Sequence, residues 1–182
     1  MPKVSIIVPI YNSEKFLGEC LSSLVNQTLR DIEIILVSDA SQDNSKDIME
    51  SYAKEDDRIV TLYNVANGMP NPRNEGIRVA KANYLGFVDA DDWVEPDMFE
   101  KLYEKTNNEK VDVVISDLRK VNEKGDIVNT EIMFDAKLFK DENNKQTILD
   151  NFAIHGGRLF TNIWKKNILF SAGFCHKKII LL

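Results

Sequence analysis

The sequence predicts an α/β fold in which helices cover both faces of a mostly parallel sheet, as in a Rossmann-like α/β/α sandwich. Short apolar runs alternate with helical patterns over the first two-thirds of the chain, which is the signature of successive βαβ units. Within these runs apolar residues scarcely alternate with polar ones, as expected for strands that are buried on both faces. The 182 residues, 43% of them hydrophobic, are enough for one domain with a substantial core, and we expect a single domain over residues 1–182.

The first two strands and the helices after them have clear local signals. Residues 4–8 form a β-branched apolar run and predict the first strand. Apolar side chains then recur at helical spacing from Phe16 to Val25, with Ser13 as the expected N-cap. Residues 32–37 predict the second strand, and after a polar turn we expect a helix over residues 43–53 with Asp43 as its cap.

The following elements continue the alternation. Residues 59–63 predict the third strand. Asn71 and Pro72 are typical of an N-cap followed by proline at the first helical position, so we expect a helix from Pro72 towards Lys81. A fourth strand is predicted at residues 84–88, a helix at about 95–106 and a fifth strand at 111–116.

The last third of the chain has a different character. Residues 119–144 are polar, and residues 123–126 predict a hairpin turn. Residues 151–182 contain no Asp or Glu, and the last four residues, 179–182, are aliphatic like the start of another strand. Because a domain rarely finishes on unshielded aliphatic side chains, we expect a truncated chain.

Composition and charge exclude several classes of protein. The chain has 23 Lys and Arg against 29 Asp and Glu, a net charge of −6, which argues against nucleic-acid binding. Two cysteines, Cys20 and Cys175, are too few for a disulfide framework, and no spacing suggests zinc. Without a signal-peptide layout or an apolar stretch near the ~20 residues of a membrane span, we expect a cytoplasmic protein with no transmembrane segment.

The strongest functional signal follows the fourth strand. In open α/β sheets ligands bind at the carboxyl ends of the strands, and here Asp89, Asp91 and Asp92 lie within four positions. At ~5 Å and an effective dielectric constant of ~20, each like-charge pair costs about 3 kcal/mol. The cluster therefore predicts a site for a hard divalent cation such as Mg²⁺ or Mn²⁺. The alternative is a helix-capping aspartate with solvated neighbours.

Polar residues also follow the other strands. Asp39 comes directly after the second strand, where its carboxylate can accept hydrogen bonds from a ligand. Tyr11 is either packed on the sheet edge or a stacking surface for a flat base. Arg73 adds positive charge to a helix N-terminus, which suits a diphosphate, although an exposed arginine is usually solvated.

Four segments in order resemble the family 2 glycosyltransferases, which have the GT-A fold. Residues 4–12, VSIIVPIYN, are similar to the family's first strand and nucleotide loop, and residues 37–45, VSDASQDNS, to its V-D-D-G-S-T-D-x-S segment. Residues 72–76, PRNEG, are similar to its A-R-N-x-G segment, and residues 87–92, FVDADD, to its F-L-D-x-D-D metal motif. The similarity extends from residue 3 to about residue 117.

The resemblance implies an inverting, metal-dependent glycosyltransferase. Its donor would be a nucleotide sugar, with a UDP-sugar expected, its cofactor Mn²⁺ or Mg²⁺, and its acceptor a hydroxyl of a saccharide or lipid-linked molecule. The family's usual role is cell-surface polysaccharide or glycolipid synthesis, which implies peripheral association with the cytoplasmic face of the membrane. Residues 1–117 would be the nucleotide-sugar-binding half, and residues 118–182 the start of an incomplete acceptor-binding half.

The resemblance also assigns residues to the site. Asp89, Asp91 and Asp92 would bind the metal, with Asp91 as its direct contact. The residues implied to bind the nucleotide sugar are Pro9, Tyr11, Asn12, Glu14, Asp39, Arg73, Asp89, Ala90 and Asp91. Tyr11 and Asp39 would hold uracil.

Two departures from the family pattern matter. Ser38 replaces its first acid, and Ala40 replaces its glycine, where a positive φ suits alanine poorly. No carboxylate follows Asp150, so we expect the general base beyond Leu182.

Three other classes of protein share some of these features. A dehalogenase-type phosphatase would need Thr or Val two residues after the second Asp, where this chain has Trp93. An NAD-binding domain would need glycines in its first turn, and residues 9–12 contain none. A non-catalytic member of the same fold, which binds a nucleotide sugar or a partner, stays open.

Overall fold

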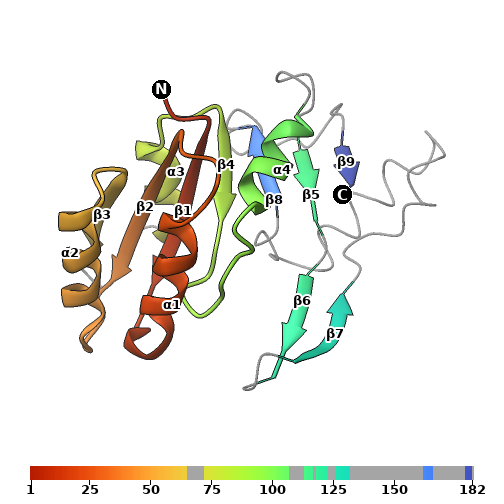
Figure 1. Ribbon diagram of the computed structural model, residues 1–182. Helices are drawn as coiled ribbons and strands as arrows, with labels where there is room; N and C mark the ends of the chain where they lie inside the picture. Colours follow the sequence, from red (N-terminus) through yellow and green to blue (C-terminus); the bar gives the residue numbers. More distant parts are fainter. Residues whose placement is uncertain are drawn as a thin grey trace.

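The computed structural model describes residues 1–64, 72–106, 113–116, 118–122, 126–131, 162–165 and 179–181. In these residues the main sheet has the strand order β3-β2-β1-β4-β8-β5-β9 (Figure 1). Its strands are β1 (Val4–Ile10), β2 (Ile32–Asp39), β3 (Ile59–Asn64), β4 (Tyr84–Phe87), β5 (Val113–Ile115), β8 (Asn162–Lys165) and β9 (Ile179–Leu181). The first four pair in parallel, β8 is antiparallel to both β4 and β5, and β9 is parallel to β5. The mostly parallel α/β sheet is therefore confirmed.

Four helices are present in the described residues: α1 (Glu14–Val25), α2 (Ser45–Glu55), α3 (Pro72–Val79) and α4 (Met98–Glu104). Alternate residues of β1 from Val4 to Ile10 form one core cluster with side chains of α1, α2 and α4. Ile7 points to the other face, where Gly76 of α3 lies against it. The helices thus cover both faces of the sheet (Figure 1), which explains why the strands are almost continuously apolar. None of the described helices is long and apolar enough to cross a membrane.

The parallel pairing brings three strand ends to one edge of the sheet. Ile10 of β1 pairs with Ser38 of β2, and Ile7 pairs with Phe87 at the end of β4. The loops that follow β1, β2 and β4 consequently leave the sheet at this edge, the lower one in Figure 1. We call it the carboxyl edge. Strands β1 and β2 each run two residues further than expected, because their pairing continues past Val8 and Val37.

Two helices begin later than the sequence predicts. Helix α2 begins at Ser45, with Asn44 as its N-cap. Helix α4 begins at Met98 instead of residue 95, because the buried Gln27 side chain accepts a hydrogen bond from the Phe99 N–H (3.1 Å) and donates to the Glu95 carbonyl (2.8 Å). A side chain from the loop after α1 thus defines where α4 starts.

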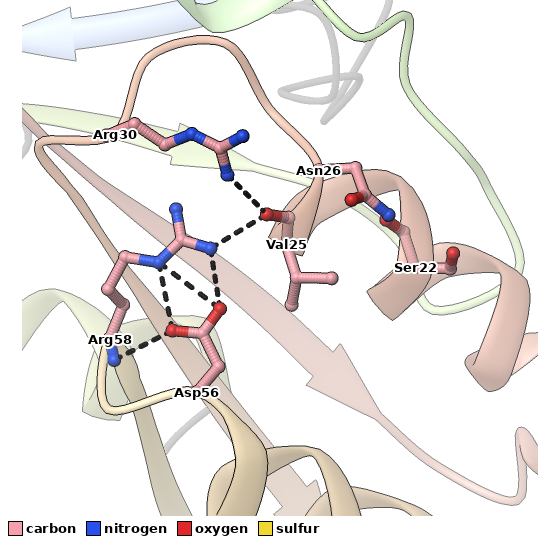
Figure 2. Close-up of polar contacts among 6 residues, drawn as sticks. All are labelled: Ser22, Val25, Asn26, Arg30, Asp56 and Arg58. Carbon is pink, nitrogen blue, oxygen red and sulfur yellow. Dashed lines mark hydrogen bonds and ion pairs between the residues drawn. The ribbon is translucent and has the colours of Figure 1, made fainter.

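The C-terminus of α1 is fastened to the start of β3 by arginine side chains (Figure 2). Arg58 Nη2 and Arg30 Nη1 both donate to the Val25 carbonyl, at 2.7 and 3.2 Å. Arg58 also pairs with Asp56 through Nε and Nη2. Because cations satisfy the last carbonyl groups of a helix, this cluster caps α1 from outside its own sequence.

Among the described residues of the final third, the local pattern indicated β9 and the hairpin but not β8. Strand β8 lies between β4 and β5, and the aliphatic residues near the end of the chain form β9, as expected. A separate antiparallel pair is formed by β6 (Leu118–Val121) and β7 (Ile127–Glu131), on either side of the predicted hairpin turn. Residues 123–125 of that turn, and Asn71, the expected N-cap of α3, lie outside the described residues.

Candidate functional site

Two of the loops at the carboxyl edge are joined by hydrogen bonds. The Asn12 N–H donates to Ser41 Oγ (3.2 Å), and the Asn12 side-chain oxygen accepts from the Gln42 N–H (2.8 Å). The Ser13 N–H donates to Ser45 Oγ (2.9 Å). The loop after β1 and the loop after β2 therefore form one unit, although about 30 residues separate their sequences.

Glu14 and Asp43 complete this connection reciprocally. Asp43 Oδ2 accepts from the Glu14 N–H (2.9 Å) and Asp43 Oδ1 from the Ser45 N–H (3.1 Å), so one carboxylate caps the first residues of both α1 and α2. Glu14 Oε2 accepts from the Asn44 N–H (2.9 Å) and from Asn44 Nδ2 (2.8 Å). Desolvation opposes ionisation of Asp43, but these hydrogen bonds outweigh it and hold the pKa of Asp43 below its ordinary value.

One of the two expected helix caps is confirmed and the other is corrected. Asp43 caps α2, as predicted, but from the position before the N-cap residue Asn44. Ser13 is the N-cap residue of α1, yet its hydroxyl donates to the Tyr11 carbonyl (3.1 Å) and makes no cap bond. Asp43, which accepts a hydrogen bond from the Glu14 N–H, takes over that role.

The residues expected to hold the base lie beside this connection. Tyr11 is 64% exposed, so its ring is not packed on the sheet edge. Asp39 ends β2 and is half-buried; within the described residues its carboxylate forms no hydrogen bond or ion pair. Asn12 and Ala40, which follow Tyr11 and Asp39 directly, have φ angles of 47° and 53°. Ala40 thus adopts the left-handed backbone that the family's glycine suits better, as the sequence suggested.

The third loop of the carboxyl edge carries the acidic cluster. The Asp92 N–H donates to the Asp89 carbonyl (3.0 Å), which closes a turn over Ala90 and Asp91. Ala90 is buried under this turn, and Asp91 and Asp92 are exposed. Asp89 is half-buried, and its Oδ1 accepts from Arg73 Nη2 at 2.7 Å. The structure therefore brings Arg73 and Asp89 together across α3 and β4.

The electrostatics of the cluster favour a cation. Burial raises the pKa of Asp89, which Arg73 opposes and Asp92 and Asp91 reinforce. Although Asp92 as a whole is exposed, partial desolvation of its carboxylate, followed by the charge of Asp91, raises the pKa of Asp92. A raised pKa means that the ionised form of the carboxylate is less stable here than in water. A nearby cation would stabilise that ionised form.

The expectation that Asp89, Asp91 and Asp92 together bind a metal ion stays a prediction. In the described part of the chain no group of three or more His, Cys, Asp or Glu side chains could hold a metal ion. In this structure the Asp89 carboxylate is paired with Arg73. One or two carboxylates together with substrate phosphate oxygens, however, are the usual environment of Mg²⁺ in proteins.

Cys20 lies directly beneath this loop. Its thiol is fully buried and donates to the Asp89 carbonyl at 3.5 Å. Burial, and then the charges of Asp92, Asp91 and Asp89, raise the pKa of Cys20 to about 12. The thiol is therefore neutral at physiological pH and serves as packing below the acids.

The structure places every residue expected in the site at the carboxyl edge, but in different roles. Tyr11, Asp39 and Asp91 present exposed or half-buried side chains there, and Pro9 is a half-buried residue of β1. Asn12 and Glu14 use their side chains to bind the neighbouring loop. Sequence reasoning missed the partners in that loop, which are Ser41, Gln42, Asn44 and Ser45, because nothing in a local pattern pairs them with residues 12–14.

The family model of glycosyl transferase family 2 matches residues 5–168. An uncharacterized glycosyltransferase, EpsJ, from Bacillus subtilis is 49% identical over 114 residues, which are 63% of this chain and 33% of that protein. A poly(ribitol-phosphate) beta-glucosyltransferase from Bacillus spizizenii is 37% identical over 158 residues, covering 76% of this chain and 25% of that protein.

The structure is also similar to a solved one. A crystal structure of residues 1–349 of S. aureus TarS, in complex with UDP-GlcNAc, superposes with a TM-score of 0.71 at 27% identity. The match covers 92% of this chain and 46% of that one. This chain thus spans less than half of the length of each of the three proteins compared.

Proposed function

The chain belongs to glycosyl transferase family 2, and from this premise we propose that its carboxyl edge binds a nucleotide sugar together with a divalent cation. The observation that carries the proposal is the meeting of three loops at one edge. They present an exposed tyrosine, a half-buried aspartate and two exposed carboxylates, and Arg73 of α3 pairs with Asp89 beside them. A base, a diphosphate and a cation need these three kinds of partner.

Tyr11 and Asp39 are proposed to bind the base of the nucleotide. An exposed aromatic ring offers a face on which a flat base can stack, and the carboxylate can accept hydrogen bonds from a base N–H or ribose hydroxyls. We propose UDP as the nucleotide, which the similarity to TarS bound to UDP-GlcNAc supports. Pro9 and Ala90 would contribute backbone surface at the ends of β1 and β4.

Asp91 is proposed as the direct ligand of Mn²⁺ or Mg²⁺, with Asp89 held beside it by Arg73. Asp92 adds negative charge to the same turn. When bound, such a cation stabilises as a Lewis acid the negative charge that develops on the diphosphate. Arg73 lies in the first turn of α3, so its guanidinium and the helix N-terminus together favour the same anion.

The proposed reaction is inverting transfer of the sugar to a hydroxyl of a saccharide or lipid-linked acceptor. The acceptor would attack from the face opposite the nucleotide while a carboxylate base removes its proton. We assign that base to none of the described residues. We propose residues 1–117 as the donor-binding half and residues 118–182 as part of the acceptor side. Synthesis of a cell-surface polysaccharide at the cytoplasmic membrane face is the proposed setting, by analogy with the relatives' glycopolymer chemistry.

The metal proposal is tested by Asp91→Asn in a thermal-shift titration with UDP and Mn²⁺. At a UDP concentration of 100 times Kd, wild-type chain should gain about 2.7 kcal/mol, or roughly 5–10 °C in Tm. Asp91→Asn should abolish the part of this gain that depends on Mn²⁺. Asp57→Asn is the matched control, because Asp57 is an exposed acid between α2 and β3, at the opposite edge. An unchanged gain in Asp91→Asn would remove Asp91 from the metal site.

The base site is tested by Tyr11→Ala. Because Tyr11 is exposed, its loss should leave the Tm of the free chain nearly unchanged while weakening UDP by about 1–2 kcal/mol, or roughly 10-fold. Isothermal titration with UDP and with Mn²⁺ alone separates the two ligands. Equal UDP affinity in both chains would contradict the assignment.

UDP binding without sugar transfer or donor hydrolysis by a longer chain would favour a non-catalytic member.

A further inference from the structure

We propose that Glu14 and Asp43 are positioning residues that hold Tyr11 and Asp39 in place, and that neither carboxylate contacts the nucleotide sugar. We name the hydrogen bonds joining residues 12–14 to residues 41–45 the loop clasp. The inference rests on the proposed function, since it concerns how the nucleotide site is kept in shape.

The first argument is the use of the carboxylate oxygens. Both oxygens of Asp43 accept from backbone N–H groups, one at the start of each helix. Glu14 Oε2 accepts two hydrogen bonds from Asn44. A nucleotide sugar that approached Glu14 or Asp43 would have to compete with these contacts. Diphosphate oxygens would also be repelled by a carboxylate that holds its negative charge.

The second argument is the position of the strained backbone. Asn12 and Ala40, with φ angles of 47° and 53°, come directly after Tyr11 and Asp39. Non-glycine residues persist in this conformation where surrounding contacts hold them. Asn12 contributes two polar groups to the loop clasp, its N–H and its side-chain oxygen. It makes both hydrogen bonds while its backbone is in this left-handed conformation. The clasp therefore stabilises the turn that determines the direction of the Tyr11 side chain.

The third argument is that little else holds Tyr11. Its side chain is 64% exposed, so packing does not determine where the ring lies. The backbone of residues 11–14 determines the position of the ring, and this backbone is tied to the loop that follows Asp39, the last residue of β2. If the two loops separate, the ring and the carboxylate that are proposed to bind one base no longer have a defined spacing.

The geometry predicts different results for two conservative substitutions. Glu14 accepts through one oxygen only, so the carbonyl oxygen of Glu14→Gln can replace it. Asp43 needs both oxygens, so Asp43→Asn sets an NH₂ group against a backbone N–H. We expect Glu14→Gln to bind UDP within about threefold of wild type. Asp43→Asn and Glu14→Ala should each lose about tenfold, the factor that corresponds to one ordinary hydrogen bond.

The experiment compares wild type, Glu14→Gln, Glu14→Ala and Asp43→Asn by UDP titration with Mn²⁺, with Glu19→Gln, an exposed acid of α1, as the charge control. Amide hydrogen exchange of peptides covering residues 11–17 and 40–47 reports on the clasp without any nucleotide. Tm without UDP reports on global stability. The expected result is faster exchange in both peptides and weaker UDP binding, in Glu14→Ala and Asp43→Asn only.

Each other outcome has a distinct meaning. Weaker UDP binding in Glu14→Gln, with exchange unchanged, would mean that the carboxylate contacts the ligand and would overturn the proposal. Faster exchange with unaltered UDP affinity would overturn it too, because the clasp would then be structural only. A wild-type chain that binds no UDP would refute the proposed function itself, and the exchange data would still show whether the clasp exists.

Discussion

Replacing Gly76 by alanine should disturb both the stability of the fold and the position of Arg73. Gly76 is buried in α3, and a Cβ at this position would lie 2.5 Å from Ile7 Cγ2 and 3.0 Å from Ile7 Cγ1. Carbon atoms in contact are normally about 3.5–4.0 Å apart. Ile7 is fully buried in the middle of β1, so it has no room to move, and α3 must withdraw from the sheet.

The size of the effect follows from two opposing contributions. Overpacking a core costs about 1–3 kcal/mol. The short contact argues for the upper end of this range, because the Cγ atoms of a β-branched side chain lie close to the backbone and cannot move away. Alanine in place of a helical glycine returns about 1 kcal/mol. The net loss is about 2 kcal/mol, or roughly 4–8 °C in Tm for a chain of this size. Gly18 of α1 is the matched control: nothing lies within 4 Å of its added Cβ, so Gly18→Ala should stabilise by about 1 kcal/mol.

Chemical denaturation of a double-mutant cycle tests the reasoning directly. Ile7→Ala alone should cost about 2–5 kcal/mol because it leaves a cavity. Combined with Gly76→Ala, the added methyl group fills part of that cavity, so the total loss should fall short of the sum by at least about 1 kcal/mol. Ile7→Val keeps both Cγ atoms and should give no such relief.

The same substitution has a functional consequence. Arg73 lies three residues before Gly76 in α3 and holds Asp89 at 2.7 Å. Withdrawal of α3 should therefore reduce stabilisation by UDP and Mn²⁺ in Gly76→Ala and not in Gly18→Ala. A Gly76→Ala chain as stable as wild type, or equal relief from Ile7→Val and Ile7→Ala, would refute the account of this contact.

Three further predictions concern stability and reactivity. Ala40→Gly should stabilise the fold by about 0.5–1 kcal/mol, as measured by urea denaturation. It removes a left-handed alanine that costs about 1–2 kcal/mol, and it adds an entropic cost of about 0.5–1 kcal/mol for glycine. A loss of stability would contradict this. Cys20, buried and with its pKa raised to about 12, should resist alkylation at pH 8 until the chain unfolds, as peptide mass mapping would show. Hydrogen bonds from Arg58 lower the pKa of Asp56 in the folded state, so its contribution to stability should be complete above the unfolded pKa of about 3.9 and disappear as pH falls through the lower folded value. Asp56→Asn should flatten that part of the acid-unfolding curve, and an unchanged curve would show that the pair contributes nothing.

Local periodicity was sufficient for the elements of the first two-thirds of the chain. Strands buried on both faces and amphipathic helices carry their pattern within a few residues, so β1 to β4 and α1 to α3 were predicted to within about two residues. The exceptions are instructive. Helix α4 starts three residues late because Gln27, 72 residues earlier than Phe99, supplies its cap. Strand β8 enters between β4 and β5 from a segment distant in sequence, and local periodicity carries no information about such pairing.

The candidate site divides in the same way. The expectation of a parallel sheet, and the rule that ligands bind at the carboxyl ends of its strands, were enough to place Tyr11, Asp39 and Asp89 at one edge. The sequence could not show that the Asp89 carboxylate turns to Arg73, or that Glu14 is engaged by Asn44. Two acidic residues of the same type can have different partners in the folded chain, and the sequence does not distinguish them.

The amino-acid order alone therefore determined which family this chain joins, where its first strands and helices lie, and which end of the sheet carries polar residues. Only the tertiary structure decided which of those residues face outward for a ligand and which are used to hold the loops together. The physical reason is that a hydrogen bond between residues about 30 positions apart depends on the register of β1 and β2, and this register is set by packing across the whole sheet.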